Sequence, residues 1–204
     1  MVKIITFEGA DYSGKSATLL QMAKRLSKRK GFIFNEGPIY PTELTARLLI
    51  LANQSNELDR EFLYTMSFAI DKSESSRNHS YDNRVVFQDR YWPSVIAYGR
   101  FLNENNSIHN HQEFRELFIN PFSTIYFSCS IEEKIKRSNL RGRKSIIDKI
   151  LLSSPDKLKR LEREIDKSIE CLPNIFRIDT THKSIEEVSL EVEKYAKSLN
   201  LQDS

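Results

Sequence analysis

Residues 9–16 read Gly-Ala-Asp-Tyr-Ser-Gly-Lys-Ser, and this stretch decides the fold. It matches the pattern G-x-x-x-x-G-K-[ST] at every fixed position. Gly9 and Gly14 let the backbone curl until several N–H groups converge on one anionic group. Lys15 supplies a positive charge for the β and γ phosphates of a nucleoside triphosphate, and Ser16 supplies a hydroxyl for Mg²⁺. The stretch therefore predicts a phosphate-binding loop with ATP contacts at Gly9, Asp11, Tyr12, Ser13, Gly14, Lys15, Ser16 and Ala17.

The sequence on either side of the loop argues against a fortuitous glycine turn. Val2–Phe7 is a β-branched and aromatic run, which predicts a strand buried on both faces. Ser16–Lys28 carries apolar residues at helical spacing, which predicts a helix. A loop between a strand and a helix binds phosphate well because the helix N-terminus adds its amides and its dipole.

The rest of the chain alternates strands with helices, which predicts one α/β domain over residues 1–204. Further strands are expected at residues 32–34, 85–87, 124–127 and 175–178. Helices are expected at residues 58–77, 94–102, 155–171 and 184–199, the last opened by a capping box of Ser184 and Glu187. Polar loops are expected at residues 103–111 and 141–145. The predicted fold is the P-loop NTPase three-layer sandwich, with a central parallel five-stranded sheet between helices and ligands at the carboxyl ends of the strands.

Composition and charge exclude several classes of protein. The 204 residues include 31 basic and 28 acidic side chains, a net charge of +3 that lacks the strong excess of a nucleic-acid binder. No apolar run approaches the ~18 residues of a membrane helix. The first residues run directly into a strand, so we expect a cytoplasmic protein without a signal peptide. Cys129 and Cys171 form no metal or redox motif, and both are expected to be buried thiols.

A second functional element follows the strand predicted at residues 85–87. The chain continues Gln-Asp-Arg-Tyr, so Asp89 and Arg90 come at a strand end. Neighbouring parallel strands end at the same edge of a sheet, which should bring Asp89 close to Ser16. Asp89 could then hold Mg²⁺ through water or orient the acceptor, and Arg90 could grip a phosphate with both guanidinium arms. The competing interpretation is a capping aspartate followed by a surface arginine.

Four segments resemble the thymidylate kinase family of nucleoside monophosphate kinases. Residues 7–16 are similar to the family pattern F-E-G-x-D-x-x-G-K-[ST], and residues 68–72, Phe-Ala-Ile-Asp-Lys, to F-x-x-[DN]-R. Residues 89–98 follow D-R-[YF]-x-x-S-x-x-A-[YF] throughout and are the most distinctive. Residues 137–143, Arg-Ser-Asn-Leu-Arg-Gly-Arg, are similar to the arginine-bearing lid.

The resemblance implies a role for each matching residue. Asp11 would contact the 3′-hydroxyl of the acceptor sugar, Phe68 would stack on its base, and Arg90 would hold its phosphate with help from Arg47. Tyr98 would pack beside the sugar. The acceptor site as a whole would comprise Asp11, Glu36, Arg47, Phe68, Lys72, Arg90, Ser94 and Tyr98. The resemblance also implies a homodimer packed through helices.

A lid over about residues 137–150 would close over the triphosphate. Arg137 would bind ATP, and the catalytic residues would be Lys15, Asp89, Arg141 and Arg143, with Ser16 and Asp89 serving the metal. A basic run such as this is by itself more typical of a solvated helix face. Phe68 also has a structural interpretation, because its predicted helix carries apolar residues that should mostly lie in the core: Leu58, Phe62, Leu63, Met66 and Ile70.

Four departures from the family pattern concern mainly the acceptor pocket. Tyr12 stands where family members place arginine or glycine, so catalytic charge must come from the lid. Lys72 replaces an arginine, Asn35 replaces the arginine of R-E-P-G, and Gly99 stands where glutamine is frequent. The leading hypothesis is ATP-dependent phosphorylation of dTMP. The alternatives are a kinase for a different acceptor, or a family member that binds nucleotides without transferring phosphate.

Overall fold

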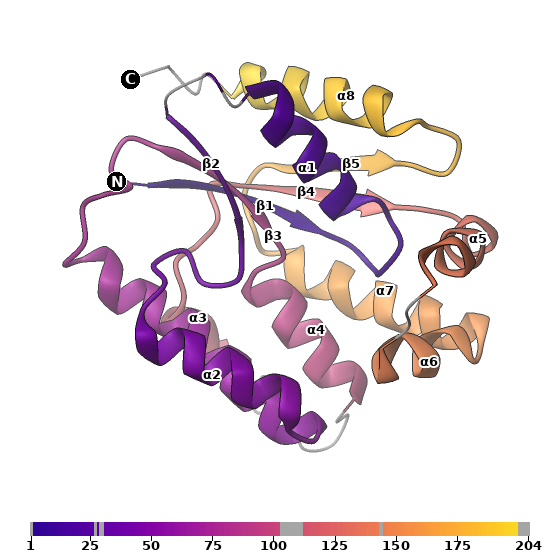
Figure 1. Ribbon diagram of the computed structural model, residues 1–204, viewed down its shortest axis with the longest axis horizontal. Helices are drawn as coiled ribbons and strands as arrows, with labels where there is room; N and C mark the ends of the chain where they lie inside the picture. Colours follow the sequence, from indigo (N-terminus) through magenta and orange to yellow (C-terminus); the bar gives the residue numbers. More distant parts are fainter. Residues whose placement is uncertain (1, 27, 29–30, 103–111, 143–144, 200–204) are drawn as a thin grey trace.

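The computed structural model describes residues 2–26, 28, 31–102, 112–142 and 145–199 and contains a five-stranded sheet (Figure 1). Its strands are β1 (Lys3–Glu8), β2 (Phe32–Glu36), β3 (Val85–Asp89), β4 (Ser123–Ser128) and β5 (Ile175–Asp179). All pair in parallel, in the order β2-β3-β1-β4-β5. The predicted parallel sheet is therefore confirmed, with every strand within two residues of its expected bounds.

Side chains alternate across the sheet and build a core on each face. On one face Phe7, Phe87 and Phe127 pack under α1 (Lys15–Leu26) and α8 (Ile185–Ser198). On the other face Ile4 and Val86 pack against α3 (Glu57–Ser75), α4 (Trp92–Leu102) and α7 (Pro155–Ile169). Figure 1 shows these two helical layers above and below the sheet. Successive residues of a strand point to opposite faces, so the apolar runs are buried on both sides as expected.

The predicted helices are present, and the capping box at Ser184 and Glu187 forms as expected. Two further helices lie in stretches without a helix prediction: α2 (Glu43–Gln54) and α6 (Ile146–Leu152). The helix α5 (Ile131–Arg141) follows β4 and carries the basic run. A 3₁₀ helix, η2, covers Gln112–Leu117. The loop expected at residues 141–145 is corrected at its start, because Arg141 still belongs to α5 and the helix ends at Gly142 with a φ of 73°. The loop expected at residues 103–111 lies outside the described residues.

Two burial predictions were wrong. Phe62 and Met66 of α3 are 50% and 40% exposed, because they lie away from the sheet. Cys129 is buried, but Cys171 is exposed because it follows the end of α7, where the guanidinium of Arg115 contacts its sulfur. Within the described part of the chain, no helix is both long and apolar enough to cross a bilayer.

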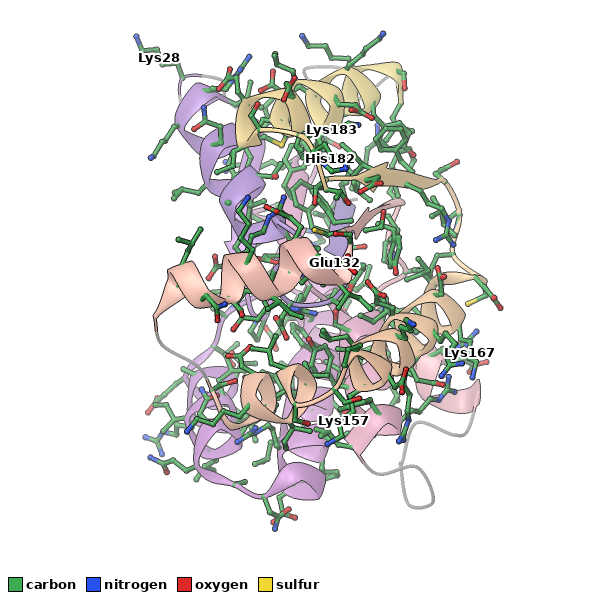
Figure 2. The ribbon with its side chains drawn as sticks, turned by 90° about the vertical axis from the view of Figure 1, so that its right-hand side faces the viewer. Lys28, Glu132, Lys157, Lys167, His182 and Lys183 are labelled. Carbon is green, nitrogen blue, oxygen red and sulfur yellow. The ribbon has the colours of Figure 1, made fainter. Side chains whose placement is uncertain are left out.

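The helices α5 and α6 flank the edge of the sheet at which the strands end (Figures 1 and 2). Figure 2 shows α5 crossing this side of the molecule, with Glu132 near its start and Lys157 and Lys167 near the two ends of α7. Lys134 fixes α5 to its neighbours. Its fully buried ammonium donates to the Cys129 carbonyl and to the Glu162 carboxylate of α7.

Lys134→Met should lower the free energy of unfolding by about 3 kcal/mol, because it leaves a partly buried carboxylate without its cation. Urea denaturation would measure the change. The matched control is Lys167→Met, which removes an exposed pair with Glu164 and should change stability by less than about 0.5 kcal/mol. Equal stabilities for the two variants would contradict this role for the buried pair.

Candidate active site

The phosphate-binding loop begins in close contact with β4. Gly9 has a φ of 143°, and a Cβ there would overlap the carbonyl oxygen of Phe127, so only glycine fits. The ammonium of Lys15 lies inside the loop and donates to the carbonyls of Gly9 (2.9 Å) and Ala10 (2.8 Å) and to the hydroxyl of Ser13 (3.3 Å). Ala17 is exposed on the first turn of α1. The loop is therefore held in its curled form by its own lysine.

Ser16 and Asp89 meet at the carboxyl ends of β1 and β3. The parallel register places Phe7 opposite Asp89, and the Ser16 hydroxyl donates to Asp89 Oδ2. The other carboxylate oxygen, Oδ1, is buried and has no hydrogen-bond partner among the described residues. A hydroxyl beside a carboxylate with a spare oxygen is a donor set that suits Mg²⁺, directly or through water. These residues therefore fit a magnesium ion.

Arg90 joins the loop to α4. Its guanidinium donates to the Gly9 carbonyl (3.1 Å), to Ser94 Oγ (3.1 Å) and to Asp11 Oδ1 (2.6 Å). The hydroxyl of Tyr98 donates to the other oxygen of Asp11, and the Arg90 guanidinium lies over the Tyr98 ring, 5.0 Å from its centroid. Arg90 has a φ of 59°, a left-handed conformation that costs free energy in a residue other than glycine. Strain of this kind is typical of functional sites.

Glu8 is a site residue for which the sequence analysis gave no role. Its carboxylate is fully buried, accepts the backbone N–H of Tyr91 (2.9 Å), and accepts a hydrogen bond from Ser94. It therefore connects the end of β1 to the start of α4 behind Arg90. Glu8 stands in the Phe-Glu-Gly segment of the family pattern, and that was the one available signal.

Burial and the nearby positive charges together set the protonation of this cluster. It raises the pKa of Glu8 from 4.5 to about 7, although Ser94, Arg90, Tyr91 and Lys15 act in the opposite direction. Burial and the positive charge of Arg90 lower the pKa of Lys15 from 10.5 to about 7. Burial would also raise the pKa of Asp11, but Arg90 and Lys15 outweigh it and hold that pKa below its usual value. Asp11 is therefore an anion at neutral pH.

The arginines of α5 lie against the outer side of the loop. Arg137 donates to the Tyr12 carbonyl (3.2 Å), to Thr180 Oγ1 (3.1 Å) and to the Thr180 carbonyl (2.7 Å). Thr180, another residue not singled out from the sequence, also donates to the Ser13 carbonyl (2.9 Å). Arg141 is exposed and lies over the Tyr12 ring. Arg143, the other candidate catalytic arginine, lies outside the described residues.

Four expected acceptor residues do not join the cluster around Arg90. Phe68 is 4% exposed and packs edge to face on Tyr91, so its ring presents no open face to a base in this structure. Lys72 donates to the Glu116 carbonyl, and Arg47 is exposed and paired with Glu43. Glu36 is exposed at the end of β2. The remaining expected residues, Asp11, Ser94 and Tyr98, do contact Arg90.

The turn after β2 is held by side chains that the sequence analysis did not assign. The Asn35 amide donates to the carbonyls of Gly37 and Pro38 (3.1 Å each) and to Gln88 Oε1 (2.8 Å). Asp71, fully buried, accepts the backbone N–H groups of Ile39 (2.9 Å) and Tyr40 (2.8 Å). Asn35, which replaces the family arginine, is thus built into the turn.

An open cavity of about 740 Å³ lies away from this cluster. It is lined by residues from the ends of β4 and β5 and from α7, among them Tyr126, Arg163 and Asp179. We therefore locate the candidate site from the phosphate-binding loop and its polar contacts, and not from the volume of this cavity.

A phosphate-binding loop whose serine meets an acidic strand end is typical of the P-loop class of nucleoside-triphosphate-binding proteins. A family model described as thymidylate kinase matches residues 7–192. The chain belongs to the thymidylate kinase family.

Individual proteins are similar to the chain in sequence or in fold. The chain is 29% identical over 202 residues to a probable thymidylate kinase of Methanocaldococcus jannaschii, with 96% of each sequence covered. A crystal structure of thymidylate kinase from Ehrlichia chaffeensis has the same fold, with a TM-score of 0.64, 19% identity, and 95% and 97% of the two chains covered. A deoxyadenosine kinase from M. mycoides is similar in fold, with a TM-score of 0.63, 13% identity, and 96% and 99% covered.

Glu8→Gln should remove a pH dependence of stability. Folded Glu8 binds its proton more tightly than unfolded Glu8, so its contribution is complete below pH 4.5 and is lost as the pH rises through about 7. The loss is about 3 kcal/mol. Glutamine can still accept the Tyr91 N–H but does not titrate. Urea unfolding from pH 4.5 to 7.5 should show the wild type losing stability relative to the variant.

The control is Glu187→Gln, which should leave the profile between pH 4.5 and 7.5 parallel to that of the wild type. The backbone N–H and hydroxyl of Ser184 lower the pKa of Glu187, so its contribution is present above its usual pKa and is lost on acidification. Parallel pH profiles for the wild type and Glu8→Gln would contradict the shifted pKa of Glu8.

Proposed function

We propose that this protein transfers the γ-phosphoryl group of ATP to dTMP and forms dTDP. The observation that carries the proposal is the contact of Ser16 with Asp89 beside a complete phosphate-binding loop, in a chain of the thymidylate kinase family. The loop supports binding of a triphosphate. The family match favours dTMP over the alternative acceptors.

The donor site is built from the loop and the first turn of α1. Lys15 would turn from the loop carbonyls to the β and γ phosphates, while the loop amides hold the phosphate oxygens. Ser16 and Asp89 would hold Mg²⁺, which when bound neutralises charge on the phosphates. Arg137 braces the Tyr12 carbonyl and so keeps the loop in shape for ATP.

The acceptor site is built around Arg90. Asp11 and Tyr98 would meet the sugar, with Asp11 accepting a hydrogen bond from the 3′-hydroxyl. Arg90, already charged and oriented by Asp11, would hold the acceptor phosphate so that one of its oxygens faces the γ phosphate. That oxygen attacks the γ phosphorus, the bond from this phosphorus to the β–γ bridging oxygen breaks, and ADP leaves. No protein nucleophile is needed.

Charge on the moving group would be stabilised from α5. Arg137 is committed to Thr180 and to the Tyr12 carbonyl, whereas Arg141 reaches the loop through a ring contact that it can exchange for a phosphate. Arg141 is therefore the catalytic arginine that the described contacts support. Lys72 is held by a main-chain carbonyl, so base recognition would require it to exchange that contact.

Incubation with ATP, Mg²⁺ and a nucleotide panel tests the proposal. dTMP should give the highest kcat/KM among dTMP, dUMP, dCMP, dAMP, dGMP, thymidine and deoxyadenosine. Arg141→Met should lower kcat by about a thousandfold, the scale of losing a catalytic arginine in phosphoryl transfer. The control is Arg163→Met, an exposed arginine of α7, which should retain full activity. Absence of ADP with every acceptor would end the proposal, and a strong preference for another acceptor would replace dTMP.

The protein would act as a cytoplasmic homodimer that binds neither nucleic acid nor membranes. The helices α2 and α3 lie side by side (Figure 1), and exposed apolar side chains on both support the dimer. On α2 the residues Leu44, Ile50 and Leu51 are 50% to 58% exposed. On α3 Phe62 is 50% exposed and Met66 is 40% exposed. A surface of this kind is typical of a protein–protein interface.

Phe62→Glu should convert the dimer to a monomer, because it places a charge within this apolar surface. Size-exclusion chromatography with light scattering would measure the mass, with the wild type at twice the chain mass. Leu190→Glu, on the distant helix α8, is the matched control and should stay dimeric. A wild type at the monomer mass would refute the dimer, and a dimeric Phe62→Glu would place the interface elsewhere.

A further inference from the structure

Tyr12 is the residue of the phosphate-binding loop that contacts the arginines of α5. Its φ of 65° is left-handed, which sets the direction of its side chain relative to the loop. The guanidinium of Arg141 lies 6.0 Å from the centroid of its ring, at the distance of a cation–π contact. Arg137, one helical turn earlier, donates to the Tyr12 carbonyl (3.2 Å). Two arginines on one face of α5 therefore hold the same loop residue, one by its main chain and one by its ring.

The hydroxyl of Tyr12 extends this contact to α6. It is buried and has no well-aligned hydrogen-bond partner among the described residues. Burial and the nearby Asp148 carboxylate raise the pKa of Tyr12 to about 12, so the hydroxyl keeps its proton at neutral pH. Asp148 also accepts the backbone N–H of Ser145 (2.7 Å) in the capping box that starts α6. The ring of Tyr12 thus lies against Arg141 of α5, and its hydroxyl lies near the Asp148 carboxylate of α6.

We propose that Tyr12 is a positioning residue for Arg141, whose guanidinium it holds beside the phosphate-binding loop. The proposal rests on the proposed function, in which Arg141 stabilises the transferred phosphoryl group. An arginine has many rotamers, and an exposed one is rarely in the productive position. The Tyr12 ring lowers this cost by holding the cation near the loop before the phosphate arrives. In this way the loop, which lacks an arginine of its own at position 12, obtains its positive charge from α5.

We expect the same side chain to link α6 to the loop, because its hydroxyl lies near Asp148. Removal of the ring should therefore loosen α6 as well as displace Arg141. These are two consequences of one side chain, and they can be measured separately, since amide exchange of α6 does not depend on catalysis.

Tyr12→Leu and Tyr12→Phe form the test pair. Both replacements keep a Cβ at a left-handed φ, so the strain of the loop is matched, and only the phenylalanine keeps the aromatic face. Tyr12→Leu should lower kcat about fivefold, the strength of an exposed cation–π contact, with little change in KM for dTMP. Tyr12→Phe should retain more than half of kcat. Hydrogen exchange at residues 146–152 should be severalfold faster in Tyr12→Leu than in the wild type, with Tyr12→Phe in between.

A double-mutant cycle separates positioning from a general loss of loop structure. If Tyr12 acts through Arg141, Tyr12→Leu should cause no further loss of kcat in the Arg141→Met background. Additive losses would overturn the proposal, as would wild-type exchange rates at residues 146–152 in Tyr12→Leu. A wild type inactive on every acceptor would refute the proposed function instead, and the exchange measurement would then still decide whether Tyr12 ties the loop to α6.

Discussion

The parallel pairing of β1 with β3 is the constraint on which the rest of the site depends. Its register sets Phe7 opposite Asp89, so Ser16 and Asp89, which are 73 residues apart in sequence, meet at the edge where the strands end. A slip by one residue would turn Asp89 to the other face and separate it from Ser16. The aromatic packing of Phe7 against Phe87 and Phe127 holds this register from one face of the sheet.

Local sequence was enough to predict the sheet. Short β-branched and aromatic runs bounded by polar residues marked all five strands, because strands buried on both faces need continuous apolar sequence. The helices α2 and α6 were less visible, because they begin at capping boxes in which the third helical residue is Thr45 or Asp148 instead of glutamate or glutamine. The exposure of Phe62 and Met66 could not be predicted from helical spacing. Such spacing indicates that a helix has an apolar face, but not which part of the protein covers that face.

The candidate site was predictable where chemistry lies in one contiguous motif. Lys15 and Ser16 follow from the loop pattern, and Asp89 and Arg90 from their place at a strand end. Glu8, Thr180 and Asp71 were not predictable in this way, because each acts by bonding to main-chain groups brought near only by folding. Their side chains do not face the place where substrate would react. They hold the main-chain segments that surround the site.

The turn after β2 is held by hydrogen bonds of uncharged amide side chains. Asn35 and Gln88 are joined amide to amide, and together they bond the carbonyls of Gly37, Pro38 and Arg90. Neither amide gains or loses a proton in water, and neither attracts counterions as a guanidinium would. These amide hydrogen bonds should keep their strength at high salt concentration and in mild acid, whereas the nearby carboxylates and lysine change their charge with pH. At position 35, where the family pattern that the chain resembles has an arginine, a neutral asparagine therefore holds the turn.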